Sequence, residues 1–180
     1  MPARSRTEDE RARALTDVAS GRFGPQAYSE WRGTSLGAIT EDLERRLIVE
    51  LAGDIEGRAV LDVGCGDGAL ALVFSQRGAA PVVGCDIDPR MIARAASGAA
   101  RRQAAIDYVL ADAERLPFAD ESFDIVSIIT VLSFLLEPDL AIRQIARVLR
   151  PGGRLVLGDL GEWSSWAAGR RLRAWRSSSL

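Results

Sequence analysis

The chain has 180 residues, 47% of them hydrophobic and 27% charged, a composition typical of one globular domain with a buried core. Its net charge of −2 argues against a general nucleic-acid-binding surface, which would make the chain basic. Two cysteines and no histidine are too few for a disulfide framework or a zinc cluster, and they exclude nucleophiles that depend on histidine.

The sequence has no segment that would place it in a membrane. No apolar run reaches the roughly 20 residues of a membrane-spanning helix. Residues 1–15 mix acids with arginines and lack the apolar stretch of a signal peptide. We therefore expect a cytoplasmic protein.

The first 56 residues are polar and have helical periodicity. Leu43, Leu47 and Leu51 recur every four residues, and Gly53 and Gly57 bracket the end of this pattern. We predict an N-terminal helical cap over residues 1–56 and a core domain over residues 57–180.

From residue 57 onward, short β-branched runs alternate with helical runs. The predicted strands are 59–63, 81–86, 106–112, 123–130 and 154–160, and the predicted helices are 68–78, 89–102 and 138–150. Such alternation gives βαβ units and a mostly parallel sheet with helices on both faces. The sequence thus predicts a doubly wound, Rossmann-like α/β fold whose ligands bind at the carboxyl ends of the strands.

The loop after the first predicted strand fits two cofactors. Gly64, Gly66 and Gly68 form the G-x-G-x-G turn of S-adenosylmethionine (SAM) enzymes, whereas Gly64, Gly66 and Ala69 satisfy the G-x-G-x-x-A fingerprint of dinucleotide-binding proteins. A plain tight turn also uses such glycines. Asp62 lies inside the strand, where a buried carboxylate needs a partner. An ammonium group suits it and a pyrophosphate repels it, so Asp62 favours a ligand with an amino-acid end.

Acidic residues also follow the second and third predicted strands. Asp86 is placed to accept hydrogen bonds from ribose hydroxyls, as in both NAD and SAM, and Ile87 to lie against a flat base. Asp88 precedes a proline and is typical of a helix N-cap. Asp112 is placed to accept from an adenine amine while the Ala113 N–H meets a ring nitrogen, which favours SAM over NAD.

Four stretches share the order and spacing of a known family: VLDVGCGDG (60–68), GCDIDPRMIARA (84–95), ADAERLPFADESFDIV (111–126) and RVLRPGGRLVLGDL (147–160). Over residues 28–176 the chain resembles the class I SAM-dependent methyltransferases of the type-11 methyltransferase domain family. The resemblance implies transfer of a methyl group from SAM, as cosubstrate, to a small-molecule acceptor without a metal. It also implies SAM contacts from Asp62, Gly64, Cys65 and Gly66 at the methionine end, Asp86 at the ribose, Ile87, Asp112 and Ala113 at the adenine, and Thr130 through its backbone.

The stretch 27–37 resembles the helical cap that closes over SAM in relatives of this type. Tyr28 and Trp31 would cover SAM or face the acceptor, and Arg32 would meet a carboxylate; packing of the two aromatic rings on the sheet is an equal alternative. No residue is assigned to catalysis, because displacement from a sulfonium needs a base only when the acceptor must lose a proton.

The resemblance implies a sheet of seven strands, and no residues match its last antiparallel pair. We therefore expect a core without the C-terminal antiparallel hairpin and an open edge at the fifth strand, which a second copy of the chain would cover. Two alternatives stay open: an NAD(P)-dependent oxidoreductase, and a truncated fold that binds SAM without turnover. Nucleic acid is not an expected partner.

Overall fold

A computed structural model describes residues 33–159 of the chain. The chain divides between Gly53 and Asp54 into two compact units. The assignment of residues 1–56 to a cap stays a prediction, because residues 1–32 lie outside the described part.

The described part of the first unit is one helix, α3 (Ser35–Ala52). Thr34 caps its beginning, where the side-chain hydroxyl accepts a hydrogen bond from the Gly37 N–H at 3.1 Å. The helix ends at Gly53, whose φ of 73° lies in the left-handed region that commonly terminates helices. The leucine periodicity of this stretch therefore predicted the element correctly.

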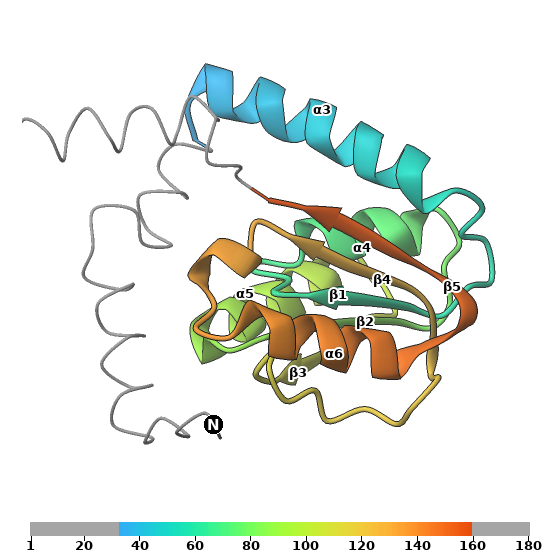
Figure 1. The fold of residues 1–180 in the computed structure, drawn as a ribbon. Coiled ribbons are helices and arrows are strands. Elements are labelled where there is room, and N and C mark those ends of the chain that lie inside the picture. The colour runs from blue at the N-terminus through green and yellow to red at the C-terminus, as the bar shows by residue number, and fades with distance from the viewer. Residues whose placement is uncertain (1–32, 160–180) are drawn as a thin grey trace, which may run out of the picture. The chain divides into compact units, whose positions relative to one another are not determined.

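The second unit contains a five-stranded parallel sheet (Figure 1). Its strands are β1 (Val60–Val63), β2 (Val82–Asp86), β3 (Asp107–Leu110), β4 (Phe123–Ile129) and β5 (Leu149–Gly158), in the spatial order β3-β2-β1-β4-β5. Each neighbouring pair is parallel. The chain builds outward from β1 through β2 to β3, and then returns to the other side of β1 with β4, so strand order reverses between β1 and β4. This topology confirms the predicted doubly wound α/β fold.

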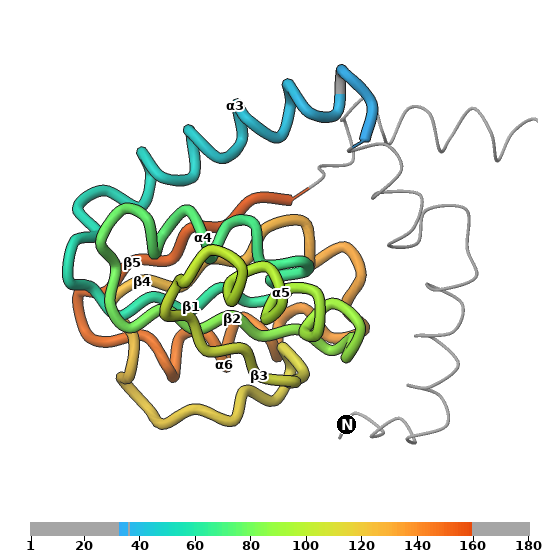
Figure 2. Tube along the Cα trace, turned by 180° about the vertical axis from the view of Figure 1, so that it is seen from behind, coloured from blue at the N-terminus to red at the C-terminus, as the bar shows by residue number. Residues whose placement is uncertain are grey.

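Helices cover both faces of the sheet. The opposite views in Figures 1 and 2 place α4 (Ala69–Gln76) and α5 (Pro89–Arg101) on one face and α6 (Pro138–Val148) on the other. A short 3-10 helix, η1 (Leu132–Phe134), lies between β4 and α6 in the chain. The central strands β1 and β4 are mostly buried because both faces of the sheet are covered there, whereas the edge strands β3 and β5 are more exposed. The main core, between the sheet and α6, includes Leu61, Val63, Cys85, Val126, Ile128, Ala141, Ile145 and Val148.

The last helix and the last strand differ from their predicted bounds. α6 ends at Val148 and β5 begins at Leu149, five residues before its predicted start at 154. Leu149 pairs with Phe123 ahead of a register shift, which extends the strand backward. β5 forms one edge of the described sheet. The expected lack of a further hairpin and the covering of this edge by a second copy stay predictions.

Candidate functional site

Three aspartates lie at the carboxyl ends of three neighbouring strands. Asp62 is the third residue of β1, Asp86 is the last residue of β2, and Asp112 lies two residues after β3. Because these strands are adjacent and parallel, their carboxyl ends lie at the same edge of the sheet. The fold therefore gathers the three carboxylates where doubly wound sheets bind their ligands.

The loop between β1 and α4 is a tight turn with a glycine at every second position. Gly64, Gly66 and Gly68 have φ values of 68°, 54° and 79°, which glycine adopts at little cost. A side chain at Gly64 would collide with the side chain of Val131, just after β4, and one at Gly68 would collide with Tyr108. These requirements arise within the protein, so the glycines alone do not identify a ligand.

Asp86 joins the glycine loop to the loop after β2. Its Oδ2 accepts a hydrogen bond from the Gly66 N–H at 2.9 Å, and its Oδ1 accepts one from the Asp88 N–H at 2.9 Å. A carboxylate has about four lone-pair sites, so both oxygens keep acceptor capacity for a ligand. Ile87, the next residue, is 47% exposed, as a surface for a flat base must be.

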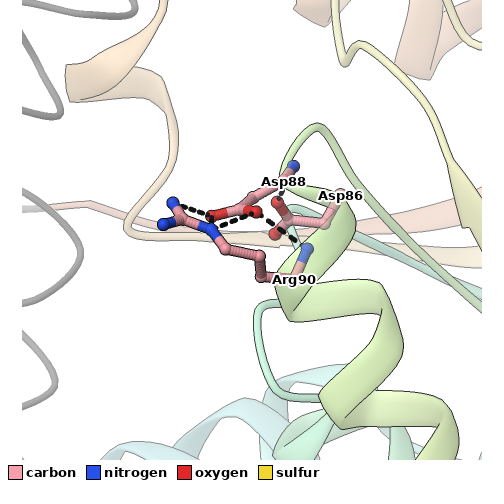
Figure 3. A network of polar contacts seen from close by, with 3 residues as sticks. All are labelled: Asp86, Asp88 and Arg90. Atoms are coloured by element: carbon pink, nitrogen blue, oxygen red, sulfur yellow. Dashed lines mark hydrogen bonds and ion pairs between the residues drawn. The ribbon is translucent and has the colours of Figure 1, made fainter.

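Asp88 begins α5 as an N-cap, which confirms its expected role. Its Oδ1 accepts a hydrogen bond from the Arg90 N–H at 2.8 Å, and its carboxylate pairs with the Arg90 guanidinium at 2.8 Å (Figure 3). The hydrogen bonds and the positive charge of Arg90 lower the pKa of Asp88. The Asp88 carboxylate thus has a positively charged partner within the protein.

Asp62 is a buried carboxyl with a hydroxyl as its partner. Only 3% of its surface is exposed, and the Ser127 hydroxyl donates to its Oδ1 at 2.7 Å. The pKa of Asp62 is raised to about 7: burial is the main cause, the Ser127 hydrogen bond acts against it, and the negative charge of Asp86 adds to it. No residue in 33–159 forms an ion pair with Asp62.

The two cysteines are buried thiols, Cys65 in the glycine loop and Cys85 in β2. Burial is the main cause that raises the pKa of both, and Asp62 and Asp86 raise it further. Reactive cysteines are thiolates in electropositive surroundings, and these thiols have the opposite environment. They serve the loop and the strand as small apolar groups.

Asp112 belongs to a loop that is held from two sides. Its Oδ1 accepts from the Glu114 N–H at 2.9 Å, and Glu114 Oε1 in turn accepts from the Glu137 N–H at 2.9 Å. Arg147 of α6 donates to the carbonyls of the residues that follow, Leu116 at 2.9 Å among them. The Asp112 loop is therefore tied to the loop that precedes α6.

Thr130 lies at the end of β4 with an unusual backbone. Its φ is 57°, which is uncommon for a β-branched residue and costly to hold. Its N–H donates to the Gly158 carbonyl at 2.7 Å, which fixes it to the end of β5. Its carbonyl is thus the backbone group left to meet a ligand, at the point where strand order reverses.

Sequence reasoning missed two residues at this site, Ser127 and Tyr108. Ser127 is fully buried in β4, and a hydroxyl inside the apolar run FDIVSII was a detectable signal for a polar partner. The Tyr108 hydroxyl is buried beside the glycine loop and has no hydrogen-bond partner within residues 33–159. Nothing in the short run DYVL indicates that contact.

Three predicted contacts, Tyr28, Trp31 and Arg32, lie outside the described residues. Within the described stretch, no helix combines the length and the apolar character needed to cross a membrane. The same stretch holds no group of three or more histidine, cysteine or acidic side chains arranged to bind a metal ion.

A family model described as a methyltransferase domain matches residues 61–157, which include all three aspartates. Among curated proteins, 27-O-demethylrifamycin SV methyltransferase of Amycolatopsis mediterranei is 39% identical over 152 residues, 81% of this chain and 55% of that protein. The chain spans about half the length of the curated relatives it matches.

Two solved structures show how far the likeness extends. An S-adenosylmethionine-dependent methyltransferase from Mesorhizobium loti is 28% identical with a TM-score of 0.57, and the match covers 62% of this chain and 51% of that one. The [4+2]-cyclase SpnF is 36% identical with a TM-score of 0.62, over 64% of this chain and 44% of that one. The same architecture therefore occurs in proteins named for different reactions.

Proposed function

Since the chain belongs to the methyltransferase domain family, whose members are SAM-dependent enzymes, we propose that it transfers a methyl group from SAM to a small-molecule acceptor by in-line displacement. The observation that carries this proposal is the placement of Asp62, Asp86 and Asp112 at the ends of adjacent strands. Three carboxylates in a row match the three parts of SAM that offer hydrogen-bond donors: the amino group, the ribose and the adenine.

The donor set of the site fits SAM part by part. Asp62 is buried and lacks a positive partner, so it suits the ammonium of the methionine end. Asp86 is half-buried with free lone pairs for two ribose hydroxyls, and Ile87 beside it is exposed for the adenine face. A pyrophosphate would face the negative charges of Asp62 and Asp86, which is why the proposal sets aside the NAD(P) alternative.

The contacts to the adenine, and the backbone contacts to the methionine end of SAM, would come from loops. Asp112 would accept a hydrogen bond from the exocyclic amine of the adenine. The Ala113 N–H has no hydrogen-bond acceptor within the described part of the chain and would donate to a ring nitrogen. Gly64, Cys65 and Gly66 would line the methionine end through their backbone, as would the Thr130 carbonyl. Tyr28, Trp31 and Arg32 stay predicted contacts of the cap.

SAM would supply a methyl group on a positively charged sulfur: the acceptor's nucleophile bonds to the methyl carbon while the carbon–sulfur bond breaks, and the sulfur leaves with the electron pair as the neutral thioether of S-adenosylhomocysteine. The residues of the chain have to bind and orient the two reactants and exclude water, because such a displacement needs no covalent intermediate. The proposal assigns no side chain to proton transfer, because an acceptor that attacks as a carboxylate, a thiolate or a free amine needs none.

Binding of SAM is the first test. Calorimetry with SAM should give saturable binding, and Asp86→Ala should weaken it strongly, since hydrogen bonds to a charged group are worth about 1.5–3 kcal/mol each. Asp88→Asn is the matched control, because asparagine also caps a helix and Asp88 faces Arg90. A protein that does not bind SAM at high concentration would refute the proposal.

Methyl transfer needs a second test, since SpnF shows that the fold also serves a cyclase. The protein would be incubated with methyl-labelled SAM and a metabolite extract, and labelled products would be identified by mass spectrometry. Labelled product supports transfer to a small molecule. Binding of SAM without any labelled product would favour a SAM-binding fold without turnover.

A further inference from the structure

Within residues 33–159, no group of opposite charge interacts with Asp62. The titratable groups that interact with it are Asp86, Cys65, Cys85 and Tyr108. Burial raises the pKa of both thiols and of the phenol, so these three are uncharged near neutral pH. Helix α4, packed against β1, has no titratable side chain. The charged neighbour is therefore a carboxylate, which opposes ionisation of Asp62.

Ser127 is the group that favours the ionised form. It lies directly opposite Asp62 in the register of β1 with β4, it is fully buried, and its hydroxyl donates to Asp62 Oδ1 at 2.7 Å. On the other side of β1, the residue opposite Asp62 is Gly84, which has no side chain to offer. Within residues 33–159 the Ser127 hydroxyl is thus the hydrogen-bond donor to this carboxylate.

The Ser127 hydroxyl has a second acceptor within reach, the Leu61 carbonyl at 3.4 Å. With Asp62 ionised, the Ser127 hydroxyl donates its hydrogen bond to the carboxylate rather than to Leu61, because hydrogen bonds to charged groups are the stronger ones. With Asp62 protonated, the hydroxyl can turn to Leu61 and accept the carboxyl proton. One side chain can therefore serve both protonation states without leaving a buried polar atom unpaired.

Resting on the proposed function, we propose that Ser127 is a positioning residue that holds Asp62 in place and ionised for the amino group of SAM, and so sets the pH range in which SAM binds. Ser127 touches neither SAM nor acceptor in this role. It acts through Asp62, and its removal would leave a carboxyl that takes up a proton at a higher pH.

The first test measures Asp62 in the protein without ligand. The carboxyl carbon of Asp62 is followed by NMR across pH in the wild type and in Ser127→Ala. Loss of a hydrogen bond to a charged group should move the titration midpoint upward by about one to two pH units. Ser127→Thr keeps the hydroxyl and should titrate as the wild type does. Ser127→Cys, close in size with a weak donor, should lie between them. An unchanged midpoint in Ser127→Ala would overturn the proposal.

The second test measures binding by calorimetry from pH 6 to pH 8.5. SAM affinity of Ser127→Ala should be about ten- to a hundredfold below wild type at the acid end, and the difference should narrow to a few-fold by pH 8.5, close to the variant's midpoint. The amino group of SAM titrates near pH 8 for both proteins alike, so the ratio of affinities isolates Asp62. A ratio that is the same at every pH would mean that Ser127 has only a structural role.

Methylthioadenosine is the matched control ligand, because it has the adenosine of SAM and lacks the amino acid. Its affinity should be the same in both proteins at every pH. Loss of methylthioadenosine binding in Ser127→Ala would also indicate a structural role. The double variant Asp62→Asn/Ser127→Ala should bind SAM with the same pH dependence as Asp62→Asn alone. A wild type that binds neither ligand would refute the proposed function itself, which separates that failure from a failure of the role of Ser127.

Discussion

The Asp86 carboxylate accepts a hydrogen bond from the Gly66 N–H at 2.9 Å, so the end of β2 holds the loop that follows β1. Asp86→Asn keeps the shape of the side chain and loses its charge. We expect SAM affinity to fall by roughly ten- to a hundredfold, because each hydrogen bond to a charged group contributes about 1.5–3 kcal/mol. Calorimetry at a fixed pH measures this change, and an affinity equal to wild type would contradict it.

Gly64→Ala should destabilise the protein more than Gly57→Ala does. Both glycines have left-handed φ values, 68° and 66°, so alanine costs about 1–2 kcal/mol of strain at either position. A side chain at Gly64 also collides with Val131, whereas nothing lies within 4 Å of one at Gly57. Overpacking adds about 1–3 kcal/mol, measurable by urea unfolding.

Adding Val131→Ala to Gly64→Ala should restore part of the lost stability, since the smaller side chain makes room. Equal losses for the two glycine variants would show that the Val131 contact carries no energy.

Tyr108→Phe should raise the free energy of unfolding. The Tyr108 hydroxyl is buried and has no hydrogen-bond partner within the described part of the chain, and a buried unpaired polar group costs about 1–3 kcal/mol. Phenylalanine keeps the ring and removes the hydroxyl. Chemical denaturation of the two proteins side by side would measure a gain of about 1 kcal/mol. A loss of stability would reveal a partner for the hydroxyl, such as an ordered water.

The stability of the ligand-free protein should depend on pH through Asp62. Its pKa is raised from the ordinary 3.8 to about 7, mainly by burial, so between these values the folded protein keeps a proton that the unfolded chain has released. The free energy of unfolding therefore falls as the pH rises from about 4 to about 7 and is level above that. At about 1.4 kcal/mol per pH unit, the fall is at most about 4 kcal/mol.

Asp62→Asn has no proton to lose and should lack this slope. Urea unfolding at pH 5, 6, 7 and 8 compares the two proteins, and parallel curves would refute the assignment. Asp88 and Asp124, whose pKa values are lowered, contribute in the opposite direction: their stabilisation is present above about pH 4 and is lost in more acidic solution.

The elements of the core domain could be predicted because their hydrophobic patterns are local. The alternation of strands and helices gave the parallel sheet, and Asp88 before a proline gave the start of α5. The start of β5 was placed five residues late, because Leu149 becomes a strand residue only by pairing with Phe123. That pairing depends on the tertiary structure and leaves no trace in the run RPGG.

The three carboxylates of the candidate site could be predicted from the sequence, whereas the residues that surround them could not. Asp62, Asp86 and Asp112 follow strands in the sequence, so their place at the sheet's carboxyl end follows from the fold class. The partner of Asp62 cannot be predicted in this way. The alternation within a strand indicates on which face of the sheet Ser127 lies, but it does not give the register that sets Ser127 opposite Asp62. The ammonium of a ligand stays a prediction for Asp62, and within the protein the partner is the Ser127 hydroxyl.

The close approach of Gly64 and Val131 joins the loop after β1 to the segment after β4. Val131 begins the segment that runs through η1 to α6, and the same segment is anchored by Ser133 on Asp159 at 2.6 Å and by Glu137 on Glu114 at 2.9 Å. A ligand that moved the glycine loop would therefore press on Val131, and through it on the segment that leads to α6.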